Sequence, residues 1–195
     1  MKHYALTGGI GSGKSTVLGL LKKMDVPTFS ADDSAKHAMQ HDPEIKKKIK
    51  SLFGDLAYKN GILDRSLIAE QVFNNKSKLE ALNSIVHPAA TAAYAKWQAL
   101  QNATYTVYEF PIVFELNAQD RFDGVILVTA PEKERIKRVI NRDHISEDAV
   151  SARMLNQWTD EQKMVLADFV IENIELSNTA SQVKALHENL LKNPN

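Results

Sequence analysis

The sequence predicts an α/β fold in which a central parallel sheet is covered by helices on both faces. A short apolar segment at the amino end leads directly into a glycine-rich turn and then into a helical pattern. Two further segments, 104–110 (TYTVYEF) and 124–129 (GVILVT), have the apolar composition of buried strands. Helical stretches separate these segments, and this alternation of strands with helices is typical of a parallel sheet.

Each element of this fold follows from its local pattern. Short apolar segments predict strands at 2–6, 26–29, 104–110, 124–129 and 169–171. Helical patterns predict helices at 14–24, 31–40, 131–142, 146–157, 160–166 and 178–191.

Residues 43–101 do not fit this alternation. They are charge-rich and helical, without a strong strand pattern, and are interrupted at Gly54 and at Asn60-Gly61. We therefore expect a helical insertion over the carboxyl ends of the strands, where a second substrate binds in an open α/β sheet.

The most specific motif is the run LTGGIGSGKST at residues 6–16, which fits the phosphate-binding pattern G-x-x-x-x-G-K-[ST]. Its glycines let backbone N–H groups point at a phosphate chain, and the next helix directs its positive dipole end at the same anion. A glycine-rich turn that binds nothing is the alternative, but such a turn does not need four glycines followed by Lys-Ser. The predicted fold class is therefore a P-loop NTPase-type three-layer sandwich with a central parallel sheet.

The composition excludes several classes of function. The 195 residues include 24 Lys and Arg and 24 Asp and Glu, so the formal net charge is zero, which disfavours a generic nucleic-acid binder. Without cysteine there is no disulfide, thiolate metal site or cysteine nucleophile. No apolar run approaches membrane-spanning length. The sequence contains no HExxH motif, so we expect no zinc site. The amino end enters a predicted strand directly. We expect a cytoplasmic enzyme without a signal peptide, a membrane partner or a nucleic-acid partner.

Further segments accompany the phosphate-binding run in a specific order. They are a short strand ending in Ala-Asp, then GILDRSLIAEQVF, LNSIVHP, FPIVFE, RVINRDHISEDAVSARMLNQW and ADFVIEN. From Leu6 to Asn173 this order resembles the dephospho-CoA kinase family. The resemblance implies that magnesium ATP donates its γ-phosphoryl group to the ribose 3′-hydroxyl of dephospho-CoA, giving coenzyme A and ADP.

With this resemblance we expect a single kinase domain over residues 1–195. Its core is predicted in 1–42, 102–134 and 158–195, the acceptor-binding helical insertion at about 43–101 and a helical lid at about 135–157. The sequence does not indicate the oligomeric state.

The predicted ATP site begins with the phosphate-binding run. Its candidate residues are Gly9, Gly11, Ser12, Gly13, Lys14, Ser15 and Thr16. Lys14 is expected to reach the outer phosphates and to act in catalysis, and the Ser15 hydroxyl is expected to contact Mg²⁺ through ATP.

Asp32 follows the second predicted strand and is a candidate catalytic and acceptor-binding residue. A carboxylate there can face the γ-phosphate and accept the proton of an attacking hydroxyl. By resemblance, the second Asp of the family's Asp-x-Asp motif maps to Asp32, whereas the first maps to Ser30. A helix N-cap is the structural alternative for Asp32, and Ser30 or Asp33 could equally be that cap.

By resemblance, Lys36, Arg65 and His87 bind the acceptor. Lys36 stands where the family often has Arg and would contact phosphate as a point charge, with a solvated lysine as the alternative. Arg65 would bind the anionic end of the acceptor, and its alternative is a surface salt bridge with Asp64 or Glu70. For His87 the alternative is a structural histidine.

Arginines gather in the predicted lid, at positions 135, 138, 142 and 153. The first three are three or four residues apart, so they share one face of a helix. This face is either a solvated surface stripe or part of a cationic lid that neutralises transition-state charge. Arg142 and Arg153 match family positions and are the candidates for ATP binding, Arg142 also for catalysis. Gln157 fits the family's Arg-x-x-x-Gln pattern and would hold the lid or a phosphate.

Two further segments match the family less closely. Asn173 matches a residue that frames the adenine, but Glu175 replaces the glycine of the family's Asn-x-Gly. Glu109 lies where many P-loop proteins have an acidic residue that organises metal. Pro111 and Glu115 match a Pro-x-x-x-Glu pattern, with a local helix start as the alternative.

Two other functions stay open. A P-loop kinase for another small hydroxyl or nucleotide acceptor would share the phosphate-binding run and would differ in the acceptor it phosphorylates. A nucleotide-dependent switch or binding module would bind ATP without phosphorylating an acceptor. The guanine-binding motif [NT]-K-x-D does not occur in the sequence.

Overall fold

The computed structural model describes residues 1–73 and 75–192. The chain forms two compact units. The core unit comprises Met1–Phe29 and Gln101–Asn195, and the helical unit comprises Ser30–Leu100.

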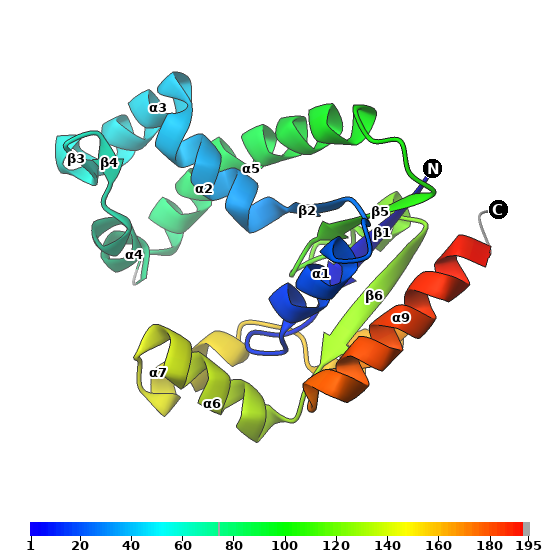
Figure 1. Cartoon of the computed structure of the whole chain (residues 1–195). Coiled ribbons are helices and arrows are strands. Elements are labelled where there is room, and N and C mark those ends of the chain that lie inside the picture. The colour runs from blue at the N-terminus through cyan, green and yellow to red at the C-terminus, as the bar shows by residue number, and fades with distance from the viewer. Residues whose placement is uncertain (74, 193–195) are drawn as a thin grey trace. The chain divides into compact units, whose positions relative to one another are not determined.

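A five-stranded parallel sheet is the centre of the core unit (Figure 1). Its order is β2 (Thr28–Ser30), β5 (Tyr105–Glu109), β1 (Lys2–Thr7), β6 (Gly124–Thr129) and β7 (Phe169–Glu172). The central strand β1 pairs in parallel with β5 and β6, so Leu6 lies opposite both Glu109 and Ile126. Because parallel strands end at one edge of a sheet, the loop after β1 opens at the edge where ligands bind in this fold class. The predicted parallel sheet is confirmed.

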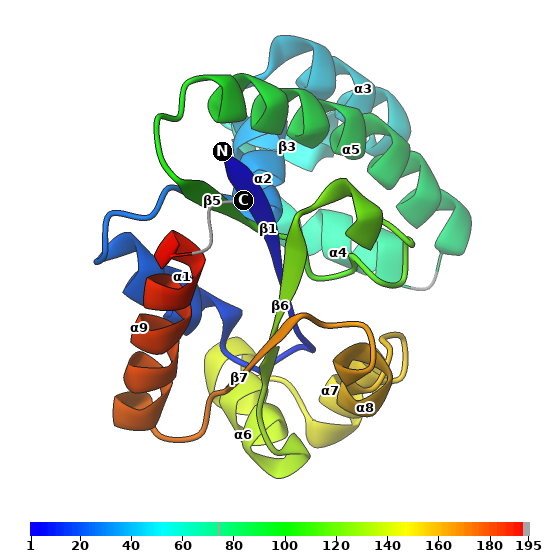
Figure 2. The same ribbon diagram turned by 90° about the vertical axis from the view of Figure 1, so that its right-hand side faces the viewer.

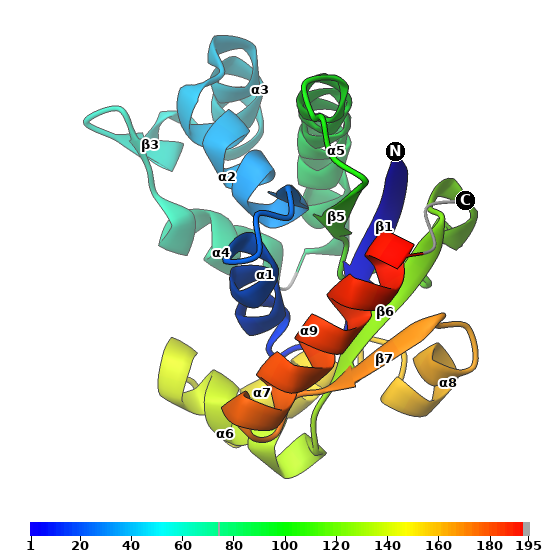
Figure 3. The ribbon, with the colours of Figure 1, turned by 45° about the vertical axis from the view of Figure 1, so that its right-hand side comes forward.

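Helices cover both faces of the sheet, as the views in Figure 2 and Figure 3 show for α9 and α8. The helices of this unit are α1 (Lys14–Lys22), α6 (Glu132–Asp143), α7 (Glu147–Met154), α8 (Asp160–Met164) and α9 (Leu176–Lys192). Leu6 and Ile126 belong to the buried cluster under α1 and α9, whereas Ala5 and Val125 belong to a second cluster with Phe114. Successive strand residues thus point to opposite faces, and both faces are buried. This confirms the three-layer architecture.

Several predicted bounds differ by two residues: the strand expected at 26–29 is 28–30, and the helices expected at 14–24 and 160–166 end at 22 and 164. Two segments differ by more. The helix expected over 146–157 ends at Met154, and Thr159 then starts a separate helix, α8, with a capping box. In the helical unit, the interruption at Asn60-Gly61 is a hairpin turn between β3 (Tyr58–Lys59) and β4 (Ile62–Leu63). The φ angles of Asn60 and Gly61 are +52° and +78°, values that suit the tight turn of a two-residue hairpin loop.

The helical unit buries a core of its own. Its main helices are α2 (Ala31–His41), α3 (Pro43–Phe53), α4 (Arg65–Phe73) and α5 (Lys76–Ala99). Ile45, Ile49 and Phe53 recur every four residues along α3, so one face of that helix is buried. Although α5 is 24 residues long, no helix within the described residues has the length and apolar character needed to cross a membrane.

Candidate active site

The loop of residues 8–15, here called the phosphate loop, joins β1 to α1 in a conformation that depends on its glycines. The φ angles of Gly11 and Gly13 are +78° and +94°, in the left-handed region that side chains disfavour. A Cβ atom added at Gly11 would lie 2.5 Å from the carbonyl oxygen of Arg135, and one added at Gly13 would overlap Nδ2 of Asn173. These glycines are therefore required both by the backbone conformation and by the groups packed against the loop.

Side chains from α6 and from the end of β7 hold the carbonyl groups of the phosphate loop. Asn173 Nδ2 donates to the carbonyl of Ser12 at 2.8 Å. Arg138 Nη1 lies 3.4 Å from the carbonyl oxygens of Gly11 and Ser12, and its Nη2 donates to the carbonyl of Asn173 at 2.8 Å. Because C=O and N–H point in opposite directions across a trans peptide, a carbonyl held on one side turns the next N–H to the other side.

Three alternating amides of this segment are available to a ligand. The N–H groups of Gly11, Gly13 and Ser15 have no hydrogen-bond acceptor within residues 1–73 and 75–192. They lie at the amino end of α1, where the helix dipole favours negative charge. Unpaired amides at a helix N-terminus form a site for an anion such as phosphate.

Lys14 folds back over the loop that precedes it. Its Nζ donates to the carbonyl of Gly8 at 2.8 Å and to that of Gly9 at 3.3 Å. A phosphate oxygen would be a stronger acceptor than these neutral carbonyls. The exposed Ser15 and the half-buried Thr16 add hydroxyl groups in the first turn of α1. Because Mg²⁺ prefers oxygen ligands, the residues present fit a magnesium nucleotide.

Arg142 and Arg153 meet on a single carboxylate, that of Asp143. Arg142 Nε lies 2.7 Å from Oδ1 of Asp143, and Arg153 Nη1 lies 3.0 Å from Oδ2. The hydrogen bonds from Arg142, with a smaller contribution from Arg153, hold the pKa of Asp143 below its ordinary value. The arginine side chains are 63% and 46% exposed, so both can also reach a ligand.

Arg135 is buried, unlike the two arginines that the family pattern favours. Its side chain is only 8% exposed and its Nη1 lies 3.1 Å from Oδ2 of Asp160. Burial raises the pKa of Asp160, an effect that the charges of Arg135 and Lys163 oppose. The spacing of the arginines predicts the helix face of Arg135 but does not single this residue out.

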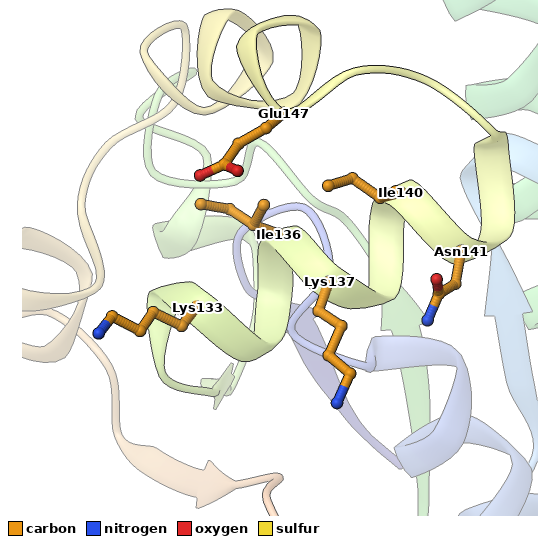
Figure 4. A pocket seen from close by; sticks show the side chains of 6 residues that line it. All are labelled: Lys133, Ile136, Lys137, Ile140, Asn141 and Glu147. Atoms are coloured by element: carbon orange, nitrogen blue, oxygen red, sulfur yellow. The ribbon is translucent and has the colours of Figure 1, made fainter.

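The opposite face of α6 is lined by lysines rather than arginines. A cavity of about 360 Å³ between α6 and the start of α7 is lined by Lys133, Ile136, Lys137, Ile140, Asn141 and Glu147 (Figure 4). At 3.6 residues per turn, helical periodicity puts Lys133 on the side of the helix roughly opposite Arg135 and Arg138. The arginine face of α6 is therefore the face that serves the phosphate loop.

Asn173, which is buried, and Glu115, which is half-buried, both act as anchors in this structure. Asn173 is 5% exposed, and its Oδ1 accepts from the hydroxyl of Thr179 at 3.0 Å. Glu115 Oε1 lies 2.9 Å from Nζ of Lys163 and accepts from the N–H of Trp158 at 3.2 Å. Residues 111–116 form turns, so the helix start considered for this segment is wrong.

The acceptor candidates all lie in the helical unit. Asp32 is exposed in the first turn of α2 and is not the N-cap, because the Ser30 hydroxyl accepts from the N–H of Asp33 at 3.2 Å. Lys36 lies 3.4 Å from Asp33 on the same helix. His87 is exposed on α5.

Arg65 is the exposed first residue of α4. Its proposed partner Asp64 is instead 2.6 Å from Lys59, whose hydrogen bond lowers the pKa of that carboxyl. In the part of the chain that is described, Arg65 makes no ion pair, so the surface salt bridge considered for it is wrong.

A family model of dephospho-CoA kinase matches residues 3–178. The chain belongs to the dephospho-CoA kinase family. A dephospho-CoA kinase of Salinibacter ruber is 39% identical over 177 residues, which cover 89% of each chain. The family resemblance found in the sequence is confirmed.

Two solved structures resemble this chain over nearly its whole length. The protein TT1252 of Thermus thermophilus has a TM-score of 0.85 and 33% identity, with 98% of this chain and 97% of that chain covered. A dephospho-CoA kinase of Campylobacter jejuni has a TM-score of 0.66 and 27% identity, with 97% of each chain covered. The chain is therefore a kinase of this family with a P-loop fold.

Sequence reasoning missed several contacts that hold the phosphate loop. The spacing of Arg135 and Arg138 was a signal for a shared face, but it did not show that this face meets the loop. Nothing in the sequence singled out Thr179 or Asp160, because a lone Thr or Asp in a helix has many uses.

Proposed function

We propose that this chain transfers the γ-phosphoryl group of ATP to the ribose 3′-hydroxyl of dephospho-CoA, giving coenzyme A and ADP. The observation that carries the proposal is the phosphate loop, with three amides available to an anion, in a chain of the dephospho-CoA kinase family.

On the donor side, the amides of Gly11, Gly13 and Ser15 would bind the phosphates of ATP. Lys14 would exchange two loop carbonyls for phosphate oxygens. The Ser15 hydroxyl would hold Mg²⁺, which supplies charge neutralisation at the phosphates when it is bound. The remaining proposed contacts with ATP come from the side chains or main chains of Gly9, Ser12, Thr16, Arg142, Arg153 and Asn173.

Arg142 and Arg153 would act from the proposed lid at 135–157. They already converge on Asp143, so the phosphates would compete with this one carboxylate for both guanidinium groups. Such cations stabilise charge that grows on the transferred group and help to exclude water.

On the acceptor side, Asp32 would accept the proton of the 3′-hydroxyl as its oxygen forms the new bond to phosphorus. The bond from phosphorus to the bridging oxygen of ATP breaks, and ADP leaves. The exposure of Asp32 and the capping of α2 by Ser30 support this role, because the carboxylate is accessible and is not needed as the N-cap of the helix. Lys36, Arg65 and His87, from the proposed insertion and α2, would bind the anionic acceptor.

A coupled ATP-consumption assay tests this proposal. ADP formation should depend on dephospho-CoA and should not appear with nucleoside monophosphates or with shikimate. Strong activity with one of those acceptors, or none with dephospho-CoA, would contradict the proposed substrate. Nucleotide binding without any phosphorylation would instead indicate a binding module.

The same assay tests Asp32 against its neighbour. Asp32→Asn should lower kcat by about 10² or more, the range expected for loss of a positioned general base. Asp33→Asn is the matched control, since Asp33 is exposed in the same helical turn, and it should keep most of the activity. Equal losses in the two variants would remove Asp32 from the proposed role.

A further inference from the structure

Ile10, in the middle of the phosphate loop, is held through both of its main-chain groups. Its N–H donates to Oε1 of Gln157 at 2.8 Å, and its carbonyl accepts from Nε of Arg135 at 3.0 Å. The guanidinium of Arg135 also lies against Gly9, where an added Cβ would overlap it. Two side chains from distant parts of the core unit therefore determine the orientation of two successive peptide planes.

The guanidinium of Arg135 is held in this position by a second partner, Asp160. Its Nη1 pairs with Asp160 at 3.1 Å, and the two side chains are only 8% and 12% exposed. The planar guanidinium presents its donors in a fixed fork, so Nε and Nη1 can serve two acceptors at once. A lysine at this position could not make both contacts with a single ammonium at the same geometry.

The segment that carries Gln157 is itself anchored to Glu115. Trp158 donates its N–H to Glu115, and the fully buried Lys163 lies 2.9 Å from the same carboxylate oxygen. Asp160, between them, is the partner of Arg135. Gln157 is thus presented by a short, anchored segment rather than by a free loop.

Holding Ile10 has a consequence for anion binding. The carbonyl of Ile10 and the N–H of Gly11 belong to one peptide plane and point in opposite directions. When Arg135 draws the carbonyl to one side, the N–H of Gly11 is turned toward the other, and it is one of the amides left available to a ligand. In a glycine-rich loop, which has many accessible conformations, such restraint lowers the entropy lost on binding.

We propose that Gln157 and Arg135 are positioning residues for nucleotide binding, which clamp Ile10 so that the phosphate loop is preorganised for the phosphates. Asp160 orients Arg135 for this task. The inference rests on the proposed function only in that the loop binds a nucleotide, and it gives Gln157 a role in shaping the loop rather than in touching a phosphate.

The test compares Gln157→Leu with Asn156→Leu. Both changes replace an amide by leucine, but Asn156 is exposed and, within the described residues, its Nδ2 bonds only to the local carbonyl of Ala152. Affinity for ADP is measured by titration with a fluorescent ADP analogue, KM is measured for each substrate, and stability is measured by urea unfolding. Loss of one preorganising hydrogen bond should weaken ADP binding and raise KM for ATP by about 3- to 10-fold.

In Gln157→Leu the KM for dephospho-CoA should stay within about twofold, and in Asn156→Leu all constants should stay close to those of the unchanged protein. A role in stability alone would lower the unfolding midpoint without changing the ADP affinity of folded protein. Unchanged ADP affinity in Gln157→Leu would overturn the inference. Arg135→Lys provides a second measurement, with the same direction expected for ADP.

The two proposals fail in different ways. If the unchanged protein does not phosphorylate dephospho-CoA but Gln157→Leu still weakens ADP binding, the proposed substrate is wrong and the clamp stands. If the unchanged protein is active and Gln157→Leu binds ADP normally, the clamp is wrong and the proposed function stands.

Discussion

Replacing Gly13 by alanine should destabilise the protein far more than the same change at Gly19. Gly13 has a φ angle of +94°, and its added Cβ would overlap Nδ2 of Asn173. Gly19 lies inside α1, and a Cβ there would meet no atom within 4 Å. Both substitutions replace glycine by alanine in or next to α1. The difference between their effects on the free energy of unfolding therefore measures the contribution of the surroundings of Gly13.

The expected size follows from the contacts. Left-handed backbone costs alanine about 1–2 kcal/mol. Moving Asn173 aside breaks its hydrogen bond to Ser12 and its bond from Thr179, each worth about 1 kcal/mol. Gly13→Ala should therefore lower the free energy of unfolding by about 3–4 kcal/mol. Gly19→Ala should raise it by about 0.5–1 kcal/mol, since alanine is the better helix former.

Urea unfolding at neutral pH measures both values by linear extrapolation. A double-mutant cycle then separates the backbone strain at residue 13 from the steric overlap between the added Cβ and Asn173. In an Asn173→Ala background the cost of Gly13→Ala should fall to the backbone strain alone, about 1–2 kcal/mol. If Gly13→Ala is as stable as Gly19→Ala, or if its cost is unchanged without the Asn173 amide, the close packing described for this loop is wrong.

Two further predictions concern ion pairs of the core unit. Lys163→Met should cost up to about 3–5 kcal/mol in urea unfolding, because it leaves the Glu115 carboxylate, whose side chain is only 15% exposed, without its cation. Adding Glu115→Gln should recover part of this loss. Equal stability of the single and double variants would count against the pair. Asp143 has a pKa below its ordinary value, so the stability it contributes is present above about pH 4 and is lost as the pH falls through the lowered pKa. Between pH 6 and pH 3 the urea unfolding midpoint of Asp143→Asn should therefore fall less than that of the unchanged protein. The difference in unfolding free energy should be at most about 1 kcal/mol. Parallel plots of midpoint against pH for the two proteins would refute this.

The sequence by itself determined the fold class, the phosphate loop and the family. These features are local, because nine consecutive residues at 8–16 specify the loop and short apolar segments specify the strands. The charge of Lys14 and the hydroxyl of Ser15 follow from the residue types alone, without knowledge of the structure. The role of Asp32 stays a prediction, although the structure removed its structural alternative by making Ser30 the N-cap.

Only the tertiary structure decided what holds the phosphate loop. Gln157, Arg135 and Asn173 contact it across 147, 125 and 161 residues of sequence. Periodicity indicates that cations share a helix face, but which neighbour that face meets depends on how α6 packs, and no local pattern encodes this. The donors of the loop are specified by its own sequence, whereas the direction in which they point is specified by side chains from the rest of the core unit.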